Sequence, residues 1–275
     1  MTLLQTLAIG LSLSLFNGKD IPTETQLQEV RDAGIEWVEV ILNPLSSRYC
    51  PENEAYHKAF VLKNSLEKAG LKVWSCHLPY SKKIDVSLVE AAAREAALAE
   101  DERMIELAGE VFRPERIVLH PSSEPISDDE RPERLKCARN SIGRLCIAAR
   151  KAGATLCVED LPRTCLGRNS EELMYMICDY PEVMVCFDTN HLLQESHEHF
   201  FSVVGSRIGT IHASDYDRVD ERHWIEGTGC IDWPAFLKTL KASGYKGVFM
   251  HEVRSGENVN PASIHAAYRK VVCGK

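Results

Sequence analysis

The stretch VMVCFDTNH, from Val183 to His191, begins as an apolar run and ends in polar groups. Five consecutive apolar residues are typical of a strand that is buried on both faces, as strands of a parallel sheet are. An acid, a hydroxyl, an amide and an imidazole follow at once, so Asp188 and His191 stand where the buried run ends. If other apolar runs end in the same way, their polar groups would gather at one edge of a sheet.

Apolar strand-like runs alternate with helical patterns along the chain. The predicted strands span 7–16, 35–42, 71–78, 116–120, 155–160, 183–189, 207–213 and 247–253. The predicted helices span 23–33, 53–69, 86–109, 131–152, 170–179, 195–204, 233–243 and 261–272. Alternating strands and helices imply parallel strands with right-handed crossovers, and eight such units in 275 residues fit a closed barrel better than an open sheet. We therefore predict an α/β fold, a single (β/α)8 TIM barrel domain over residues 1–275.

Short motifs mark several of the expected element ends. An Ala-Gly pair closes three helices just before a strand, as expected when glycine takes the left-handed position after a helix: Ala33-Gly34, Ala69-Gly70 and Ala152-Gly153. The N-terminal apolar run could pass for a signal peptide, but no basic residue precedes it. Its residues alternate from Leu7 to Leu15 between large apolar and small side chains, which favours a strand over a cleaved leader.

Composition narrows the classes of protein and partner. Hydrophobic residues make up 44% and charged residues 26%, which is ordinary for a soluble globular protein. The net charge of −8 argues against nucleic acid or an anionic membrane as the main partner, and no apolar stretch is long enough to span a bilayer. The ten cysteines form no CxxC pair, and several lie within apolar runs, which indicates buried thiols in a reducing, cytoplasmic compartment rather than disulfides.

Polar groups follow six consecutive predicted strands, where barrel enzymes build their sites. They are His77, His120, Glu159, Asp188 with His191, His212 and Glu252, and the loop after the seventh strand adds Glu221 and His223. Several carboxylates gathered on the barrel axis would repel each other and be costly to bury. A divalent cation removes that penalty, and mixed nitrogen and oxygen ligands suit Zn²⁺, Mn²⁺ or Co²⁺. The regular placement therefore predicts a metal site.

Each of these residues also has an ordinary structural reading. A single strand-end histidine is commonly a hydrogen-bonded core residue, and Glu159 or Glu252 alone could cap a helix or pair with an arginine. Alternation turns Asp160 and His251 away from the axis, so we expect structural roles for both.

The polar, glycine-containing loop 214–232 is long enough to act as a lid or ligand loop. The sequence contains no GxSxG elbow, Walker loop or helix-opening GxGxxG motif.

The motifs FDTNH, IHASD and ERHWIEGTGCIDW resemble those of the xylose-isomerase-like barrel superfamily, which includes sugar isomerases, sugar epimerases and the endonuclease IV type of DNA-repair enzyme. The resemblance extends from HLPY to HEV, nearly the whole chain. It implies one divalent metal, Mn, Zn, Co or Mg, and four ligands for it: Glu159, Asp188, His212 and Glu252. It also implies contacts with substrate from four residues: His191, His77, His120 and Arg218.

The leading hypothesis is a metal-dependent isomerase or epimerase that acts on a small sugar or polyol derivative. Glu159 and Glu252 are the expected catalytic acid and base, which transfer a proton through a metal-stabilised enediolate. His191 is expected to donate a hydrogen bond to a substrate oxygen. The sequence leaves open which sugar reacts and whether the chain forms a homo-oligomer.

A second hypothesis is a zinc-dependent phosphodiesterase of the endonuclease IV type, acting on abasic DNA. The resemblance then implies additional metal ligands at five positions: His77, His120, His191, Glu221 and His223. Glu221 departs from the pattern, since aspartate is usual there. The negative net charge counts against this hypothesis. A third class is a carbohydrate-binding barrel that has kept the site without turnover.

Overall fold

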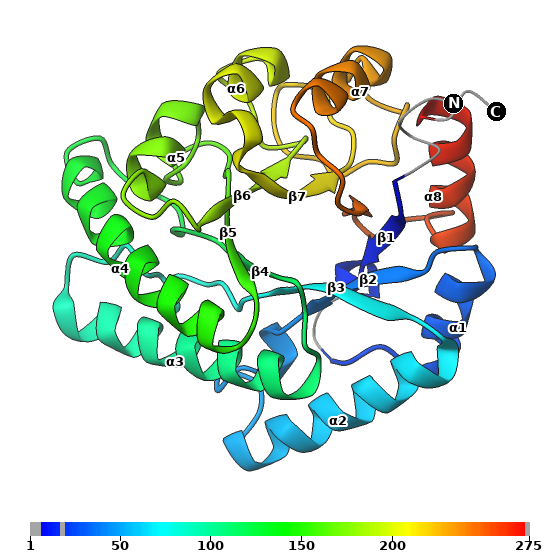
Figure 1. Ribbon diagram of the computed structural model, residues 1–275, viewed down its shortest axis with the longest axis horizontal. Helices are drawn as coiled ribbons and strands as arrows, with labels where there is room; N and C mark the ends of the chain where they lie inside the picture. The colour runs from blue at the N-terminus through cyan, green and yellow to red at the C-terminus, as the bar shows by residue number, and fades with distance from the viewer. Residues whose placement is uncertain (1–6, 17–19, 273–275) are drawn as a thin grey trace.

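The computed structural model describes residues 7–16 and 20–272, which form a closed barrel of parallel strands with helices around it (Figure 1). The strands are β1 (Ile9–Ser12), β2 (Trp37–Ile41), β3 (Lys72–His77), β4 (Arg116–Leu119), β5 (Thr155–Glu159), β6 (Met184–Asp188), β7 (Ile208–Ala213) and β8 (Phe249–His251). Each strand pairs with its sequence neighbours, and β1 pairs with β8 to close the ring. The predicted (β/α)8 architecture is confirmed.

One principal helix follows each strand and packs outside the barrel (Figure 1). The helices are α1 (Glu24–Asp32), α2 (Glu52–Ala69), α3 (Ala91–Val111), α4 (Arg131–Lys151), α5 (Ser170–Ile177), α6 (His197–Val204), α7 (Trp233–Ala242) and α8 (Pro261–Ala267). Short turns of other helical types are η2 (Leu13–Phe16), η3 (Asn43–Leu45), η4 (Gly205–Arg207) and η5 (Tyr268–Val272). The three glycines expected after helices have positive φ angles of 84°, 69° and 80°, at Gly34, Gly70 and Gly153.

The first strand is shorter than predicted, because the expected strand 7–16 turns into a 3-10 helix after Ser12. The Ser12 hydroxyl accepts a hydrogen bond from the backbone of Ser14, a local bond that competes with strand pairing. Leu13 and Leu15 stay buried in the core through this turn. The apolar alternation therefore continues past the end of the strand, which is why the sequence pattern overestimated its length.

The third helix begins at Ala91 rather than at residue 86. Asp85 accepts hydrogen bonds from both the backbone and the hydroxyl of Ser87, and it forms a buried ion pair with Arg134 at 2.7 Å. These bonds hold the segment in a loop conformation. The carboxylate of Glu90 then caps the helix by accepting from the first backbone N–H groups.

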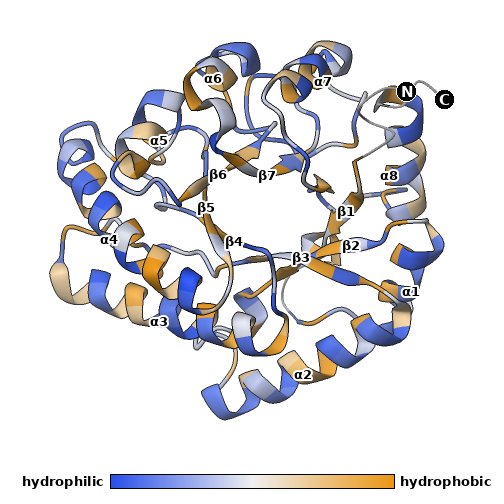
Figure 2. Ribbon diagram, in the orientation of Figure 1, coloured by the Kyte–Doolittle hydropathy of each residue, from blue (hydrophilic) through white to orange (hydrophobic). Residues whose placement is uncertain are grey.

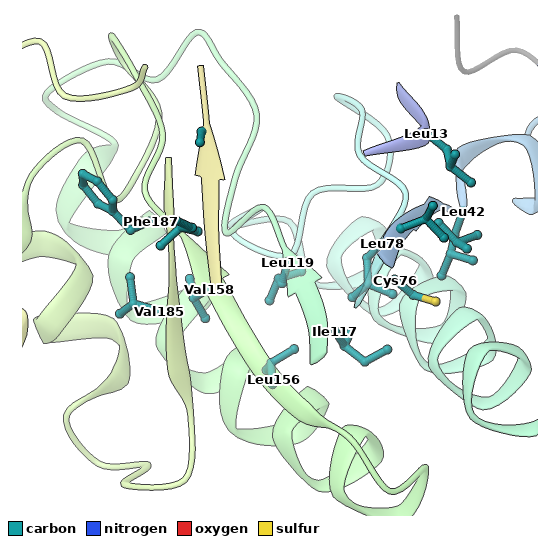
Figure 3. Packing of buried hydrophobic residues seen from close by; sticks show 14 of the residues in the cluster. Leu13, Leu42, Cys76, Leu78, Ile117, Leu119, Leu156, Val158, Val185 and Phe187 are labelled. Atoms are coloured by element: carbon teal, nitrogen blue, oxygen red, sulfur yellow. The ribbon is translucent and has the colours of Figure 1, made fainter. Parts of the chain in front are cut away.

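Strand side chains alternate between the helices outside and the barrel interior. Outward residues of β4, β5 and β6 join one large core with the helices, as Figure 3 shows for Ile117, Leu156 and Val185. The inward residues of these strands form a separate cluster of Val118, Cys157 and Cys186. Figure 2 shows largely hydrophobic strands and helices of mixed hydropathy. The same alternation brings Glu159 and Asp188, two residues farther along β5 and β6, to the inner face.

The described cysteines agree with the prediction that most thiols are buried. Nine are described; all are free thiols, and seven of them are buried. Burial raises the pKa of the Cys157 thiol to about 12, so this side chain behaves as a small apolar group.

Among the helices of residues 7–16 and 20–272, none combines the length and apolarity needed to cross a bilayer.

We predict that His197→Phe weakens the dependence of stability on pH. His197 packs against Phe187 and Phe236, and burial lowers its pKa to about 4. The unfolded chain takes up a proton below about pH 6.5 and the folded protein does not, so stability falls as pH decreases from there toward 4.

Between about pH 7 and pH 5 this difference is worth about 2 kcal/mol in the free energy of unfolding. Urea unfolding at both pH values measures it. His199→Phe is the matched control, because His199 lies in the same helix and is exposed. Equal pH dependence in the wild type and His197→Phe would contradict the assignment.

Candidate functional site

Four side chains at the C-terminal ends of β5 to β8 converge on one point. In register, Asp188 lies beside His212, and Glu252 follows β8 by one residue. The Nδ1 atom of His212 lies 3.2 Å from Glu159 Oε1 and 3.0 Å from Glu252 Oε2. The four residues each offer a ligand atom, and these atoms all lie within 4.8 Å of one another. The structure thus brings together the four metal ligands expected from the sequence.

The charge of this group is unbalanced. Three carboxylates surround one imidazole, and no lysine or arginine of the described residues pairs with any of them. Asp188 is fully buried, and its Oδ2 atom has no hydrogen-bond partner. Burial and then the charges of Glu252 and Glu159 hold the pKa of Asp188 well above its usual range. A divalent cation fits this donor set, because it would satisfy the orphaned oxygen and offset the repulsion.

The pKa of Glu159 shifts in the opposite direction to that of Asp188. Burial by itself would raise its pKa, but the imidazoles of His212 and His120 hold the pKa well below the usual range. Glu252 behaves in the same way, since His212 outweighs burial and lowers its pKa. Both glutamates therefore stay ionised beside the buried Asp188.

Glu39 is a buried residue of this site that sequence reasoning missed. It lies in β2, is fully buried, and accepts hydrogen bonds from Ser75 Oγ at 2.8 Å and His212 Nε2 at 3.0 Å. With a proton held on Nε2 by Glu39, the Nδ1 atom that faces Glu159 and Glu252 could bind an ion once its own proton is lost. Carboxylates commonly orient metal-binding histidines in this way. The available signal was a single acid inside the apolar strand WVEVI.

A second group lies beside the first and shares Glu159. His77 Nε2 and His120 Nε2 each lie 3.2 Å from Glu159 Oε2, whereas the other oxygen of Glu159 faces His212. Burial opposes a charge on His77, but Glu159 and neighbouring acids raise its pKa to about 9. His77, His120 and Glu159 therefore form a second set that could hold an ion.

A third set consists of Asp188, His191 and His223. The Nδ1 atom of His191 donates to the carbonyl oxygen of Asp160 at 2.7 Å, and burial lowers the pKa of His191 to about 4. A neutral ring that donates from Nδ1 carries a lone pair on Nε2. His191 can therefore accept a hydrogen bond or bind an ion through Nε2, which reverses the donor role expected from the sequence.

Two other predicted residues differ in placement, since Glu221 Oε2 lies 3.7 Å from His191 Nε2 of the third set whereas Arg218 lies apart from all three sets. Glu221 belongs to none of the metal groups found among the described residues and lies 3.3 Å from Arg163 Nη2 and 3.6 Å from Arg254 Nη2. Arg218 is exposed, does not line the cavity above the site, and acts electrostatically on His197. The position of Arg218 gives no support to its predicted contact with substrate.

The loop 214–232 is fastened to the barrel by Asp215. This buried carboxylate accepts hydrogen bonds from Gly227 N at 2.8 Å, Ile231 N at 3.1 Å and Trp233 Nε1 at 3.0 Å. Asp215 also pairs with Trp224 through two backbone bonds. The expected ligand loop is thus a fixed wall of the site, and its bonds explain much of the motif ERHWIEGTGCIDW.

A cavity of about 820 Å³ opens above the convergent side chains. Glu159, His120, His191 and Glu252 line it, and the loops after the strands form its walls. The acidic and imidazole groups therefore face a space that a small polar molecule can enter.

We predict that a divalent metal stabilises the wild type more than Asp188→Asn. Excess Mn²⁺ at about a hundredfold its dissociation constant is worth about 2.7 kcal/mol to the wild type. Asp188→Asn loses a ligand but also loses like-charge repulsion, so with EDTA it should melt no lower than wild type. Melting temperatures with Mn²⁺ and with EDTA measure both effects. Glu124→Gln, at the cavity rim, is the control that should behave as wild type.

We predict that Glu39→Gln weakens metal binding about 10–100-fold, the range typical for partners that orient a ligand. Competition with a chelator measures the affinity, and the visible spectrum of the Co²⁺-loaded protein reports the geometry around the ion. Ser75→Ala removes a bond to Glu39 but leaves the bond to His212, so its effect should be smaller. Unchanged affinity and spectrum in Glu39→Gln would remove Glu39 from the site.

Comparison with known proteins identifies the family of the barrel. A family model described as "Xylose isomerase-like TIM barrel" matches residues 27–270. A "Ketose 3-epimerase" of Arthrobacter globiformis is 24% identical over 242 residues, which are 86% of this chain and 78% of that protein.

Solved structures share the fold over almost the whole chain. A D-tagatose 3-epimerase-like protein superposes with a TM-score of 0.80 at 20% identity, covering 98% of this chain and 96% of that one. D-psicose 3-epimerase from Clostridium cellulolyticum H10, solved with D-tagatose, gives 0.77 at 18% identity, with 98% and 92% covered. Given this barrel and the extent of the family match, the chain belongs to the xylose isomerase-like TIM barrel family.

Proposed function

We propose that this protein is a divalent-metal-dependent sugar isomerase or epimerase. The observation that carries the proposal is the convergence of Glu159, Asp188, His212 and Glu252 beneath a cavity. The similar proteins named as ketose and D-psicose 3-epimerases support a ketose or a related keto sugar as substrate. The metal is Mn, Zn, Co or Mg, because the donors are carboxylates and imidazole.

An ion held by these four residues would polarise the sugar carbonyl and a neighbouring hydroxyl, which acidifies the adjacent C–H bond. Glu159 and Glu252 lie 3.2 and 3.0 Å from His212 Nδ1, and both line the cavity. One carboxylate removes the proton from carbon, and the other returns a proton. Return to the opposite face of the same carbon gives epimerisation, and return to the neighbouring carbon gives isomerisation.

Other residues of the cavity bind and orient the sugar. His191 accepts a hydrogen bond from a hydroxyl through Nε2, because its Nδ1 proton is committed to Asp160. Burial and the nearby acids Glu252 and Glu159 raise the pKa of Tyr80 to about 12, so its phenol stays protonated and can donate. His120 stacks on Tyr80 with ring centroids 4.3 Å apart, which fixes both rings.

A zinc phosphodiesterase is the second candidate, and the two additional ligand sets favour it. Glu221 pairs with Arg163 and Arg254, and these cations compete with an ion for its carboxylate. Arg163 is in turn held by Glu124 and Asp220, so this cation is already neutralised. The net charge of −8 also disfavours DNA, and we therefore place this candidate second.

We also propose that the chain is one domain that works in the cytoplasm. The free thiols of the described cysteines suit a reducing compartment. A homo-oligomer is compatible with this function, and the chemistry proposed above does not depend on it.

We predict that Glu159→Gln and Glu252→Gln each reduce sugar C–H exchange by about 10²–10⁴-fold, the usual value of a positioned acid or base. Exchange of ketose protons in deuterated water, followed by NMR, measures it. Glu124→Gln is again the control and should exchange normally.

Native mass spectrometry of the same samples counts the bound ions. One metal per chain in the wild type supports the isomerase, and close to three supports the phosphodiesterase. Full exchange by either glutamine variant with its metal still bound would show that the glutamates are not the acid and base.

A further inference from the structure

The cavity extends beyond the groups that the proposed chemistry uses. The loops after β1, β2 and β3 build a wall that differs from the acidic and imidazole floor. Its uncharged members are Ser14, Ile41, Asn43, Tyr49, Tyr80 and Ser81. Tyr49 and Tyr80 leave 51% and 45% of their surface exposed while lining the cavity. This wall therefore offers aromatic surface to a ligand.

Contacts on the protein side hold this wall in place. Tyr80 stacks on His120 at an interplanar angle of 27°, and its carbonyl oxygen accepts from Asn43 Nδ2 at 3.4 Å. The Oδ1 atom of Asn43 has no hydrogen-bond partner among the described residues, although solvent scarcely reaches it. The guanidinium of Arg48 lies 5.2 Å from the ring centroid of Tyr49. Aromatic rings that line a cavity beside polar side chains are suited to binding an amphipathic ligand.

The size of the cavity exceeds what a free ketose needs. Its volume of about 820 Å³ lies toward the upper end of the roughly 300–1,000 Å³ typical of pockets that enclose drug-sized ligands. A monosaccharide bound at Glu159 and Glu252 is much smaller than such ligands. Space for a further group therefore remains beside the tyrosines.

The charges around the cavity disfavour a phosphate as that group. Of the three lysine and arginine side chains that line it, Arg163 pairs with Glu124 at 2.7 Å and Arg254 faces Glu221 at 3.6 Å. Only Lys82 is left without an ion-pair partner among the described acids. Phosphate sites usually combine several convergent donors, which this wall does not provide.

We propose that the surface formed by Tyr49 and Tyr80 is a subsite for a second, uncharged sugar ring. The substrate is then a keto sugar that carries a glycosidic substituent, rather than a free or phosphorylated monosaccharide. The apolar face of the second ring packs on the tyrosines, and its hydroxyls face the polar side of the wall at Ser81. This assignment rests on the proposed function for the reacting ring, but its binding component can be measured without turnover.

The test compares three probes that share one reacting end: D-fructose, isomaltulose with a glucosyl group on O6, and fructose 6-phosphate. Calorimetry with the metal-loaded protein gives their dissociation constants, and proton exchange in deuterated water gives their turnover. We expect isomaltulose to bind about tenfold more tightly than D-fructose, and fructose 6-phosphate to show no such gain.

Variants of Tyr49 test whether its ring accounts for the tighter binding of isomaltulose. Tyr49→Ala should abolish it and leave binding of D-fructose unchanged, whereas Tyr49→Phe keeps the ring and should retain it. Tyr175→Ala is the matched control, because Tyr175 is an exposed tyrosine of α5 that does not line the cavity.

Each result decides between the two proposals. Tighter isomaltulose binding without exchange supports the subsite and counts against the isomerase. Exchange with equal affinity for D-fructose and isomaltulose overturns the subsite and leaves the isomerase in place. The subsite is also overturned if fructose 6-phosphate binds most tightly, if no probe binds, or if Tyr49→Ala keeps the gain.

Discussion

Electrostatic crowding at the mouth of the barrel is the constraint on which the site depends. The parallel register of β5 to β8 forces Glu159, Asp188 and Glu252 together, and the imidazole of His212 does not offset the repulsion and burial felt by Asp188. The pKa values of Asp188 and Glu159 move in opposite directions, because burial and the charges of Glu252 and Glu159 raise that of Asp188 whereas the imidazoles of His212 and His120 lower that of Glu159. A cation relieves that excess, so the arrangement that costs free energy in the empty cluster is also what gives affinity for a metal.

The cluster of charged side chains lies at the mouth of the barrel, and the apolar packing that stabilises the fold lies below it. Below the site the interior is filled by apolar clusters that include Trp74, Met250 and Cys186. Above them, buried acids fasten the loops: Asp215 holds the loop after β7, and Asp85 with Arg134 holds the segment after β3. Loops that are tied at both ends keep the cavity walls in place, which a site of several converging groups requires.

Much of the site could be predicted because strand ends are visible in a sequence. Glu159 and Asp188 each follow an apolar run, and parallel strands bring such ends to one rim. Glu39 was not predicted, because it lies inside a strand rather than at a strand end. Its partner His212 belongs to β7, which faces β2 across the barrel only in the folded structure. Arg218 was placed by spacing alone, and loop spacing does not determine where a side chain points. The first strand was overestimated because Leu13 and Leu15 stay buried in a 3-10 turn.

The sequence by itself determined the alternating order of strands and helices, the helix ends at Gly34, Gly70 and Gly153, and the set of polar residues at the strand ends. These depend on local periodicity and backbone preference, which neighbouring residues encode. Only the tertiary structure decided which nitrogen of His191 and His212 faces the site, which acids pair with Arg163, and how large the cavity is. Those properties arise from contacts between residues far apart in the chain, and no local pattern specifies them.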